Sequence, residues 1–361
     1  MQDIHPIITP HNAVKVGHLV QLGWYNGMIY PKHMRWHPHK PLLAMAYFDG
    51  GTDVAATAIW SAAGKRMFHT SDSTRHPIHE YSAGWSYDGR FFATGLHTIT
   101  IYNDRQEKLR EIPGHILEWS PRTYALATRA SGDIAIIDIR QARMIGLEDS
   151  ADTVLGWAST LRWQDNGGWA GVGAAEIKHW DSNGACIARH AFPHGARRAG
   201  RTAAIRKWMW SPDGQRLVYA TIDQVLVVDP RGKQLFAVSA DTSACFMEAV
   251  VWHSRRHELA IIDGWDVQRW DLDGKHMATL KGRHYGIVAL GWSPDGRILA
   301  TGSWDSTICL WSDDGTLLHT LFTWERRNSI GAVFGLKWSA DGRYLAAALR
   351  DCSVHLYAII D

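Results

Sequence analysis

The histidine-rich segment "KHMRWHPHK" offers a dense set of metal ligands in a sequence that contains 20 histidines. His33, His37 and His39 are the candidate ligands, but a metal ion needs donors that converge on one point with supported geometry. The segment straddles Trp36 and a predicted turn, so the three imidazoles should face different ways. We therefore predict a solvated turn here and no metal site.

The acidic residues are not paired in the way that acid–base catalysis requires. They recur instead within predicted turns, where Asp is a favoured residue. The recurrent positions are Asp88, Asp213, Asp295, Asp313, Asp314 and Asp341. The sequence also lacks GxSxG, a phosphate-binding glycine-rich loop and HExxH. We predict a protein that is not an enzyme, with no catalytic residue and no cofactor.

A basic segment at 182–212 is suited to bind phosphates or an acidic protein surface. It contains six Lys and Arg residues and no Asp or Glu. The candidate anion-binding residues are Arg189, Arg197, Arg198, Arg206 and Lys207. A long solvated connection between two strands would explain the same composition. Nucleic acid or another polyanion is therefore the alternative partner in this interpretation.

Tryptophan is unusually frequent, with 19 in 361 residues. Eight tryptophans lie in copies of one short pattern, and "GWSPDGRILA" at Gly291, "MWSPDGQRLV" at Met209 and "KWSADGRYLA" at Lys337 are clear examples. The eight anchors are Trp36, Trp85, Trp119, Trp163, Trp210, Trp252, Trp292 and Trp338. They are 34 to 49 residues apart, and a period of about 40–45 residues is typical of four-stranded propeller blades.

Further landmarks after the anchors complete a four-stranded meander. An alternating run ends in a bulky residue, as in "ICLW" at Trp311 or "VQRW" at Trp270, and turns such as "SDDGT" lead into a short strand. Period-two alternation with Asp-Gly and Asn-Gly turns is typical of antiparallel hairpins. Such a sheet buries both faces only when sheets pack on one another, so the pattern predicts an all-β propeller.

These landmarks resemble the WD40 repeat, whose units begin near Gly-His, pass through a Ser-Pro-Asp-Gly turn and end in Trp-Asp. The resemblance covers essentially the whole chain and is strongest at 282–312. It implies a single domain over 1–361, with four strands per blade that we name a to d from the anchor strand onward. Ser303, Asp305 and Trp311 match members of a buried hydrogen-bonded network that is frequent in this family.

The landmarks favour eight blades, with seven as the alternative if one weak unit is misread. The eighth unit ends at "SVHLYAIID" without a strand d, and a spare strand, "AVKVGHLVQL" at 13–22, precedes the first anchor. Propellers of this family are often closed by an N-terminal strand that pairs with the last blade, which removes exposed sheet edges. We therefore expect the segment at 13–22 to supply the missing strand.

Aromatic residues that the repeat does not explain indicate a binding surface. In a WD40-like blade the b–c turn and the d–a loop lie on the same rim, around the mouth of the channel. Exposed aromatics and arginines are typical of interface hot spots. The predicted partner-binding residues are Trp157, Arg201, Phe246, Trp265, Arg283, Tyr285 and Trp304. The alternative is that these aromatics pack under their own loops.

The resemblance thus implies a non-catalytic scaffold that binds a protein or peptide on this rim, as a subunit of a multiprotein complex. The nearly balanced charge, 38 Lys and Arg against 36 Asp and Glu, argues against a globally basic nucleic-acid binder. No apolar run suits a membrane span, no secretory signal is visible, and four dispersed cysteines suit a reducing compartment. We expect a cytoplasmic protein that is monomeric by itself. An enzyme with paired ionisable groups on the propeller axis is the remaining alternative.

Overall fold

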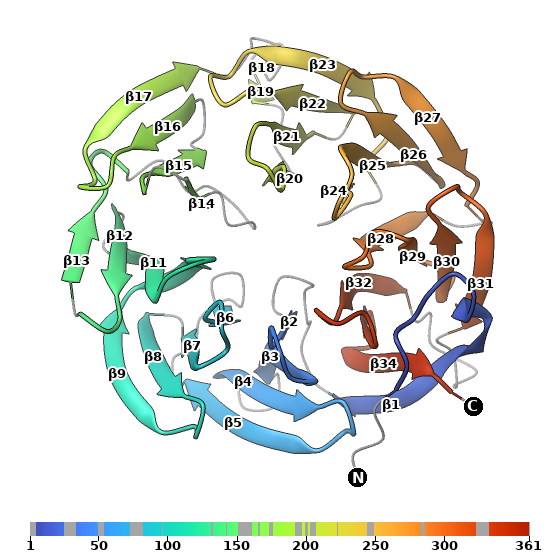
Figure 1. The fold of residues 1–361 in the computed structure, drawn as a ribbon, viewed down its shortest axis with the longest axis horizontal. Helices are drawn as coiled ribbons and strands as arrows, with labels where there is room; N and C mark the ends of the chain where they lie inside the picture. Colours follow the sequence, from blue (N-terminus) through green and yellow to red (C-terminus); the bar gives the residue numbers. More distant parts are fainter. Residues whose placement is uncertain are drawn as a thin grey trace. The chain divides into compact units, whose positions relative to one another are not determined.

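The repeated sequence unit folds as a four-stranded antiparallel sheet in the computed structural model (Figure 1). The structure describes residues 5–24, 34–49, 54–72, 82–95, 97–130, 133–141, 143–150, 161–164, 167–172, 176–191, 197–198, 201–202, 207–221, 223–243, 249–282, 286–322 and 332–360. Within these ranges eight sheets have four strands each. The fold class is therefore the eight-bladed β-propeller, as predicted, and the seven-bladed alternative is wrong.

The chain divides into two compact units, of which unit 1 comprises Met1–Arg75, Ile222–Gln224 and Val238–Asp361. Its sheets have the strand orders β2-β3-β4-β5, β24-β25-β26-β27, β28-β29-β30-β31 and β1-β34-β33-β32. The strands are β1 (Val16–Trp24), β2 (Met34–Trp36), β3 (Leu42–Asp49), β4 (Val54–Ser61), β5 (Arg66–Asp72), β24 (Val250–Trp252), β25 (Glu258–Asp263), β26 (Asp266–Asp271), β27 (His276–Leu280), β28 (Ile287–Trp292), β29 (Ile298–Ser303), β30 (Thr307–Ser312), β31 (Leu317–Phe322), β32 (Val333–Trp338), β33 (Leu345–Leu349) and β34 (Ser353–Ile359).

Unit 2 comprises His76–Thr221 and Val225–Ala237 and holds the other sheets, apart from a few residues of the last one. Their strands are β6 (Ser82–Trp85), β7 (Phe91–Gly95), β8 (Thr98–Asn103), β9 (Lys108–Pro113), β10 (His115–Trp119), β11 (Ala125–Ala130), β12 (Asp133–Asp138), β13 (Arg143–Gly146), β14 (Arg162–Trp163), β15 (Trp169–Val172), β16 (Glu176–Trp180), β17 (Cys186–Ala191), β20 (Lys207–Trp210), β21 (Leu217–Ala220), β22 (Gln224–Val228) and β23 (Gln234–Ser239). A separate two-stranded hairpin pairs β18 (Arg197–Arg198) with β19 (Arg201–Thr202).

Each anchor tryptophan ends the first strand of its sheet, as predicted. Several of these indoles also join neighbouring sheets of one unit. In unit 1, the Trp36 indole N–H donates to the carbonyl of Lys337 at 3.0 Å. The Trp338 indole N–H donates to the carbonyl of Gly291, also at 3.0 Å. The anchors therefore pack as apolar bodies and also supply a directional bond between sheets.

The predicted network around Trp311 differs in one partner. The Trp311 indole N–H donates to the Thr301 hydroxyl at 3.1 Å. The Ser303 hydroxyl bonds instead to the carbonyl of Gly286, at 3.3 Å. Thr301 lies two residues further from the turn on β29, where it faces the indole of β30, so it takes the role that the sequence suggested for Ser303.

The N-terminal strand β1 completes the last blade, as expected. It pairs antiparallel with β34, with Val16 opposite Ile359 and His18 opposite Tyr357. The strand starts later than predicted, because Ala13–Lys15 forms a 3-10 turn. This turn follows Asn12, whose side-chain oxygen accepts a bond from the Thr9 N–H at 2.7 Å.

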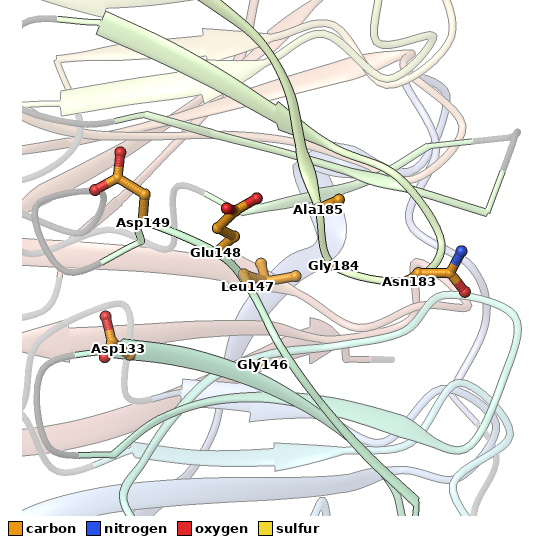
Figure 2. Close-up of a pocket in the computed structure, with 8 residues that line it drawn as sticks. All are labelled: Asp133, Gly146, Leu147, Glu148, Asp149, Asn183, Gly184 and Ala185. Atoms are coloured by element: carbon orange, nitrogen blue, oxygen red, sulfur yellow. The ribbon is translucent and has the colours of Figure 1, made fainter.

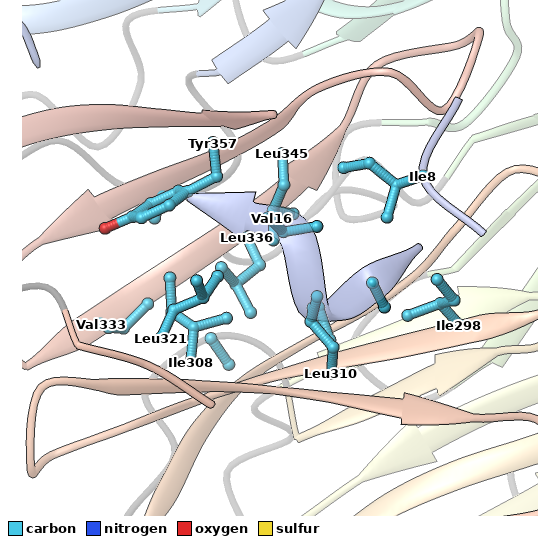
Figure 3. Close-up of a cluster of buried hydrophobic side chains, with 14 of the residues drawn as sticks. Ile8, Val16, Ile298, Ile308, Leu310, Leu321, Val333, Leu336, Leu345 and Tyr357 are labelled. Carbon is cyan, nitrogen blue, oxygen red and sulfur yellow. The ribbon is translucent and has the colours of Figure 1, made fainter. Parts of the chain in front are cut away.

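Apolar side chains of the N-terminal segment enter two core clusters of unit 1. Ile8 and Val16 belong to a cluster with Ile298, Leu310 and Leu345, and Figure 3 shows Val16 among these strands. A second cluster joins β1 to the sheets of β2–β5 and β32–β34; its members include Leu22, Leu43 and Leu356, all fully buried. Burial on both faces fixes β1 in place.

A chain of polar bonds also ties β1 to β34. The ring nitrogens His18 Nε2 and His355 Nδ1 are 2.9 Å apart. On its other side, His355 Nε2 is 3.0 Å from the Ser353 hydroxyl, which in turn donates to the Asp351 carboxylate at 2.5 Å. Ser353 is fully buried and its hydroxyl proton is committed to Asp351, so this serine–histidine–aspartate set has a structural role.

No helix among the described residues is long and apolar enough to cross a membrane.

Leu22→Ala is expected to lower the free energy of unfolding by about 2–5 kcal/mol, because it leaves a cavity where β1 meets two sheets. Thermal or urea unfolding followed by tryptophan fluorescence measures the change. The matched control is Val14→Ala, since the Val14 side chain is 64% exposed just outside the strand and its loss should cost less than about 0.5 kcal/mol. Equal losses in the two variants would contradict the role of β1.

The a–b turn after Trp252 contains a buried histidine, His253, whose hydrogen bonds depend on pH. In the turn after Trp292, the Ser293 hydroxyl accepts the Ile298 N–H at 3.0 Å. In the turn after Trp252, His253 replaces the serine, and its Nδ1 accepts the N–H groups of Arg255 and Arg256 at 3.0 and 2.8 Å. Burial is the main cause that lowers the pKa of His253. A proton on Nδ1 would remove the acceptor.

We expect the free energy of unfolding to decrease as the pH is lowered, because of His253. The unfolded chain binds the imidazole proton more tightly than the folded protein, so stability is kept above the unfolded pKa of about 6.5 and lost as pH falls through the lowered folded-state pKa. His253→Ser should therefore lose less stability than the wild type between about pH 7.5 and about pH 5.5. Urea midpoints of the wild type and the variant at the two pH values test this. An equal loss of stability in both proteins would refute it.

Candidate partner-binding surface on unit 1

The b–c turns of unit 1 lie at one end of their sheets, together with the ends of the d strands. Phe322, the last residue of β31, is opposite Thr307, which follows the turn of Trp304. Leu280 at the end of β27 is likewise opposite Val267, which follows the turn of Trp265. We call this end of the sheets the unit-1 rim; its exposed or half-buried members are Trp265, Trp304, Phe322 and Arg350.

Trp265 is exposed on a turn whose backbone is tightly held. It is 63% exposed, although tryptophan is highly buried on average in folded proteins. The preceding Gly264 adopts a φ of +60° and its N–H donates to the Asp241 carbonyl at 2.7 Å. A β-carbon at Gly282 would lie 1.6 Å from the Trp265 carbonyl oxygen, so the next connection packs directly on this turn. The indole therefore projects from a fixed support.

Carboxylates surround the Trp265 turn and take part in internal bonds. Asp263 accepts the Asp241 N–H at 2.8 Å. Asp266 accepts the Gly282 N–H at 3.0 Å and pairs with Lys281 at 2.8 Å. These acids shape the turn, and their bonds explain the rigidity of the Trp265 backbone.

Trp304 is half-buried, and its ring contacts the neighbouring sheet. The centroids of the Trp304 and Phe334 rings are 5.3 Å apart, in an edge-to-face arrangement with an interplanar angle of 88°. The Arg350 guanidinium carbon lies 5.5 Å from the centroid of the same indole. The backbone N–H of Trp304 donates to the Gly286 carbonyl at 3.1 Å. Phe334 and Arg350 were not predicted as site residues.

The remaining predicted rim residues cannot be placed as side chains. Trp157, Phe246, Arg283 and Tyr285 lie outside the described residues. For Arg201, only the backbone is described, in β19. Of the predicted partner-binding set, the structure therefore places two tryptophans, Trp265 and Trp304, on adjacent sheets of the unit-1 rim.

The basic segment is described mainly through its backbone. Arg197 and Arg198 form β18, Lys207 begins β20, and Arg206 lies outside the described residues. Arg189 is described in full and pairs with Asp149 and, at 3.9 Å, with Glu176. Its charge is thus shared with carboxylates of its own chain.

A shallow cleft of about 510 Å³ lies beside Arg189 in unit 2 (Figure 2). It is lined by Asp133, Gly146, Leu147, Glu148, Asp149, Asn183, Gly184 and Ala185. The buried Lys178 ammonium donates to the Asp149 carbonyl at 2.7 Å and is 3.5 Å from the Glu176 carboxylate. Lys178 and Arg189 therefore balance the charge of Asp149 and Glu176 from within the protein. Among the described residues, no cluster of His, Cys, Asp and Glu is arranged to hold a metal ion.

Residues 274–312 and 315–357 match the family model described as "WD domain, G-beta repeat". This chain is a WD40-repeat β-propeller. The matched residues cover β27 to most of β34, which includes the Trp304 turn and the Arg350 turn. The WD40 resemblance seen in the sequence is thereby confirmed.

The WD40 propeller has relatives among curated proteins. It is 24% identical over 276 residues to the B-type cell cycle switch protein ccs52B of Medicago truncatula, across 70% of this chain and 53% of the relative. It is 26% identical over 251 residues to Protein FIZZY-RELATED 1 of Arabidopsis thaliana, across 64% of this chain and 50% of the relative. The chain spans about half the length of the curated relatives it matches.

Solved structures share the fold at low sequence identity. The C-terminal WD40 domain of Sif2 aligns with a TM-score of 0.67 and 14% identity, over 96% of this chain and 99% of that one. A chain from a structure titled "Crystal Structure of Mitotic Checkpoint Complex" aligns with a TM-score of 0.56 and 18% identity, over 100% of this chain and 95% of that one. At these identities the similarity concerns the fold.

Proposed function

We propose that this WD40 propeller is a non-catalytic scaffold that binds a partner protein or peptide through the unit-1 rim. The observation that carries the proposal is the Trp265 side chain, 63% exposed on a turn held by Gly264, Asp266 and Gly282. Folding gains little from an exposed indole, whereas interfaces are enriched in Trp and Arg at their energetic centres. A fixed backbone also lowers the entropy lost on binding.

The apolar surface of the rim extends beyond Trp265. Phe322 is 68% exposed at the end of β31, beside the turn that carries the half-buried Trp304. Trp304 is braced by Phe334, so its accessible part has a defined orientation. Two tryptophans and a phenylalanine at one end of adjacent sheets offer a partner more rigid aromatic area than scattered surface residues do.

The relatives support the same class of function. One similar structure comes from a complex of proteins, and the curated relatives include cell cycle switch and FIZZY-RELATED proteins. We infer by this analogy that the chain works as a subunit of a multiprotein complex. Its action as a single cytoplasmic domain without a cofactor, monomeric by itself, remains part of the proposal.

Trp265→Ala combined with Trp304→Ala should remove a specific partner while the protein stays folded. Affinity purification with wild type and variant identifies the partner, and titration of the purified partner should show a loss of affinity of about 30-fold or more, as expected when hot-spot residues are truncated. Circular dichroism and the thermal midpoint check folding.

Met144→Ala is the matched control, because the Met144 side chain is 68% exposed but lies on β13 of unit 2. It should leave the affinity within about twofold. If the double variant keeps every partner with unchanged affinity, the interface lies elsewhere on the protein.

A second candidate function is polyanion binding by the basic segment, favoured by the register of the β18–β19 hairpin. Arg198 lies directly opposite Arg201, and Arg197 lies opposite Thr202. Like charges directly opposite each other destabilise a strand pair. A bound anion would offset this repulsion, so the hairpin is suited to a phosphate-rich partner.

Arg197→Glu with Arg198→Glu should abolish binding of mixed-sequence double-stranded DNA, and wild-type affinity should fall steeply as salt increases because counterions are released. Fluorescence anisotropy across a salt series measures both effects. Arg255→Glu changes charge at an exposed position of unit 1 and should retain most of the affinity. Binding that survives both high salt and the double substitution would rule out this candidate.

A further inference from the structure

Two turns of the unit-1 rim share one backbone design. In the first, the Asp305 carboxylate accepts the N–H of Thr307 at 2.9 Å and its hydroxyl at 2.5 Å. The intervening Ser306 has a φ of +69°. The N–H of the leading residue, Trp304, donates to the connection that precedes its sheet.

The second turn repeats each of these features on the next sheet. The Asp351 carboxylate accepts the N–H of Ser353 at 3.1 Å and its hydroxyl at 2.5 Å, and Cys352 has a φ of +67°. The N–H of Arg350 donates to the Ala332 carbonyl at 2.8 Å. Arg350 thus occupies the position that Trp304 holds one blade earlier.

The leading side chains of the two turns contact each other. The Arg350 guanidinium carbon is 5.5 Å from the centroid of the Trp304 indole, within the range of a cation–π contact. The indole also contacts the Phe334 ring in an edge-to-face arrangement. Arg350 remains exposed although its guanidinium lies over the ring, so a partner can reach this residue.

Arg350 has no ion-pair partner within the described part of the chain. The adjacent Asp351 is bonded to Ser353 and does not serve as its counter-ion. Two other arginines of unit 1 do have such partners: the exposed Arg256 is 2.6 Å from the Asp313 carboxylate, and the half-buried Arg343 is 3.4 Å from Asp341. Among the described residues, it is the aromatic face of Trp304 that the Arg350 guanidinium contacts.

A guanidinium in contact with an aromatic ring is well prepared to bind a carboxylate. Its planar fork presents paired N–H donors that match the two oxygens of Asp or Glu, and the contact with the ring restricts the side chain before the ligand arrives. The exposed Phe322 and the indole of Trp304 add apolar surface to the same rim, which strengthens a charge-assisted bond by excluding water.

We propose that Arg350, held over Trp304, is the subsite that binds an Asp or Glu side chain of the partner. This inference rests on the proposed function of the unit-1 rim and names the chemistry of its ligand. It assigns Trp304 a positioning role for Arg350 in addition to its own contact with the partner.

The test uses a phage-displayed library of random dodecapeptides, selected on the full chain. A selected peptide is defined as rim-bound when Trp265→Ala or Phe322→Ala weakens it by about tenfold or more, so neither Trp304 nor Arg350 enters the definition. Rim-bound peptides should share an Asp or Glu at one position.

A double-mutant cycle then isolates the contact. Arg350→Gln in the protein and Glu→Gln (or Asp→Asn) in the peptide should each reduce affinity by about tenfold, and together by little more than either alone. Arg350→Lys should recover only part of the affinity, because it keeps the charge and loses the planar fork. Unchanged thermal midpoints confirm that the variants fold.

The outcomes separate the two levels of the proposal. Rim-bound peptides whose acidic residue is not coupled to Arg350, or that carry none, would overturn this subsite and leave the rim as the interface. A selection that yields no rim-bound peptide would overturn the proposed function together with the subsite.

Discussion

The strand-a tryptophan is the residue on which this architecture depends, because in the blades of Trp36, Trp119 and Trp338 its indole N–H bonds one sheet to its neighbour. In unit 2, Trp119 donates to the carbonyl of Gly84 at 3.1 Å. In unit 1, Trp36 and Trp338 donate in the same way, to Lys337 and Gly291. In every case the acceptor immediately precedes the anchor of the adjacent sheet. A buried indole N–H without an acceptor costs about 1–3 kcal/mol of stability. The bond therefore favours one position of each sheet along its neighbour.

Contacts between neighbouring sheets also hold the rim residues near one another. The Trp338 bond ties the last sheet to β28, and the b–c turns of the same two sheets bring Arg350 to the ring of Trp304. The Trp292 indole N–H has no hydrogen-bond partner among the described residues, and other contacts join its sheet to the sheet of β24. The Ser254 hydroxyl donates to the Ser293 carbonyl at 2.6 Å, and Arg269 lies over the ring of Trp292. Sheet packing and the binding surface are therefore consequences of the same set of contacts.

The fold was accessible from sequence because each blade repeats the same local rules. The anchors, the Asp-containing turns and the alternating strands recur, so errors in one unit are corrected by the others. The spare N-terminal strand could also be found, since the last unit visibly lacked a partner for β34. Its start was less predictable, because Ala13–Lys15 forms a short 3-10 turn directly after Asn12, whose side chain accepts the Thr9 N–H. Local side-chain bonds of this kind compete with strand formation.

The site was accessible only in part, because a repeat identifies what is unusual within a unit and not what lies beside it. Trp265 and Trp304 stood out as aromatics without a structural task. Arg350 did not, because its importance comes from a contact across sheets to Trp304. Likewise, the choice of Thr301 over Ser303 as partner of Trp311 depends on side-chain direction along β29. Information of this kind is three-dimensional and has no signature in composition or spacing.

The three rim turns show how a repeat protein can specialise without losing its fold. Each contains an Asp preceded by a variable residue: Trp265 before Asp266, Trp304 before Asp305, and Arg350 before Asp351. The Asp bonds to the backbone of its own turn or of the next connection, so its replacement would disturb the scaffold. In two of these turns the preceding residue donates its backbone N–H to the connection before its sheet, and any residue except proline can supply that bond. Its side chain is therefore the position at which recognition can change from blade to blade while the turn beneath it stays the same.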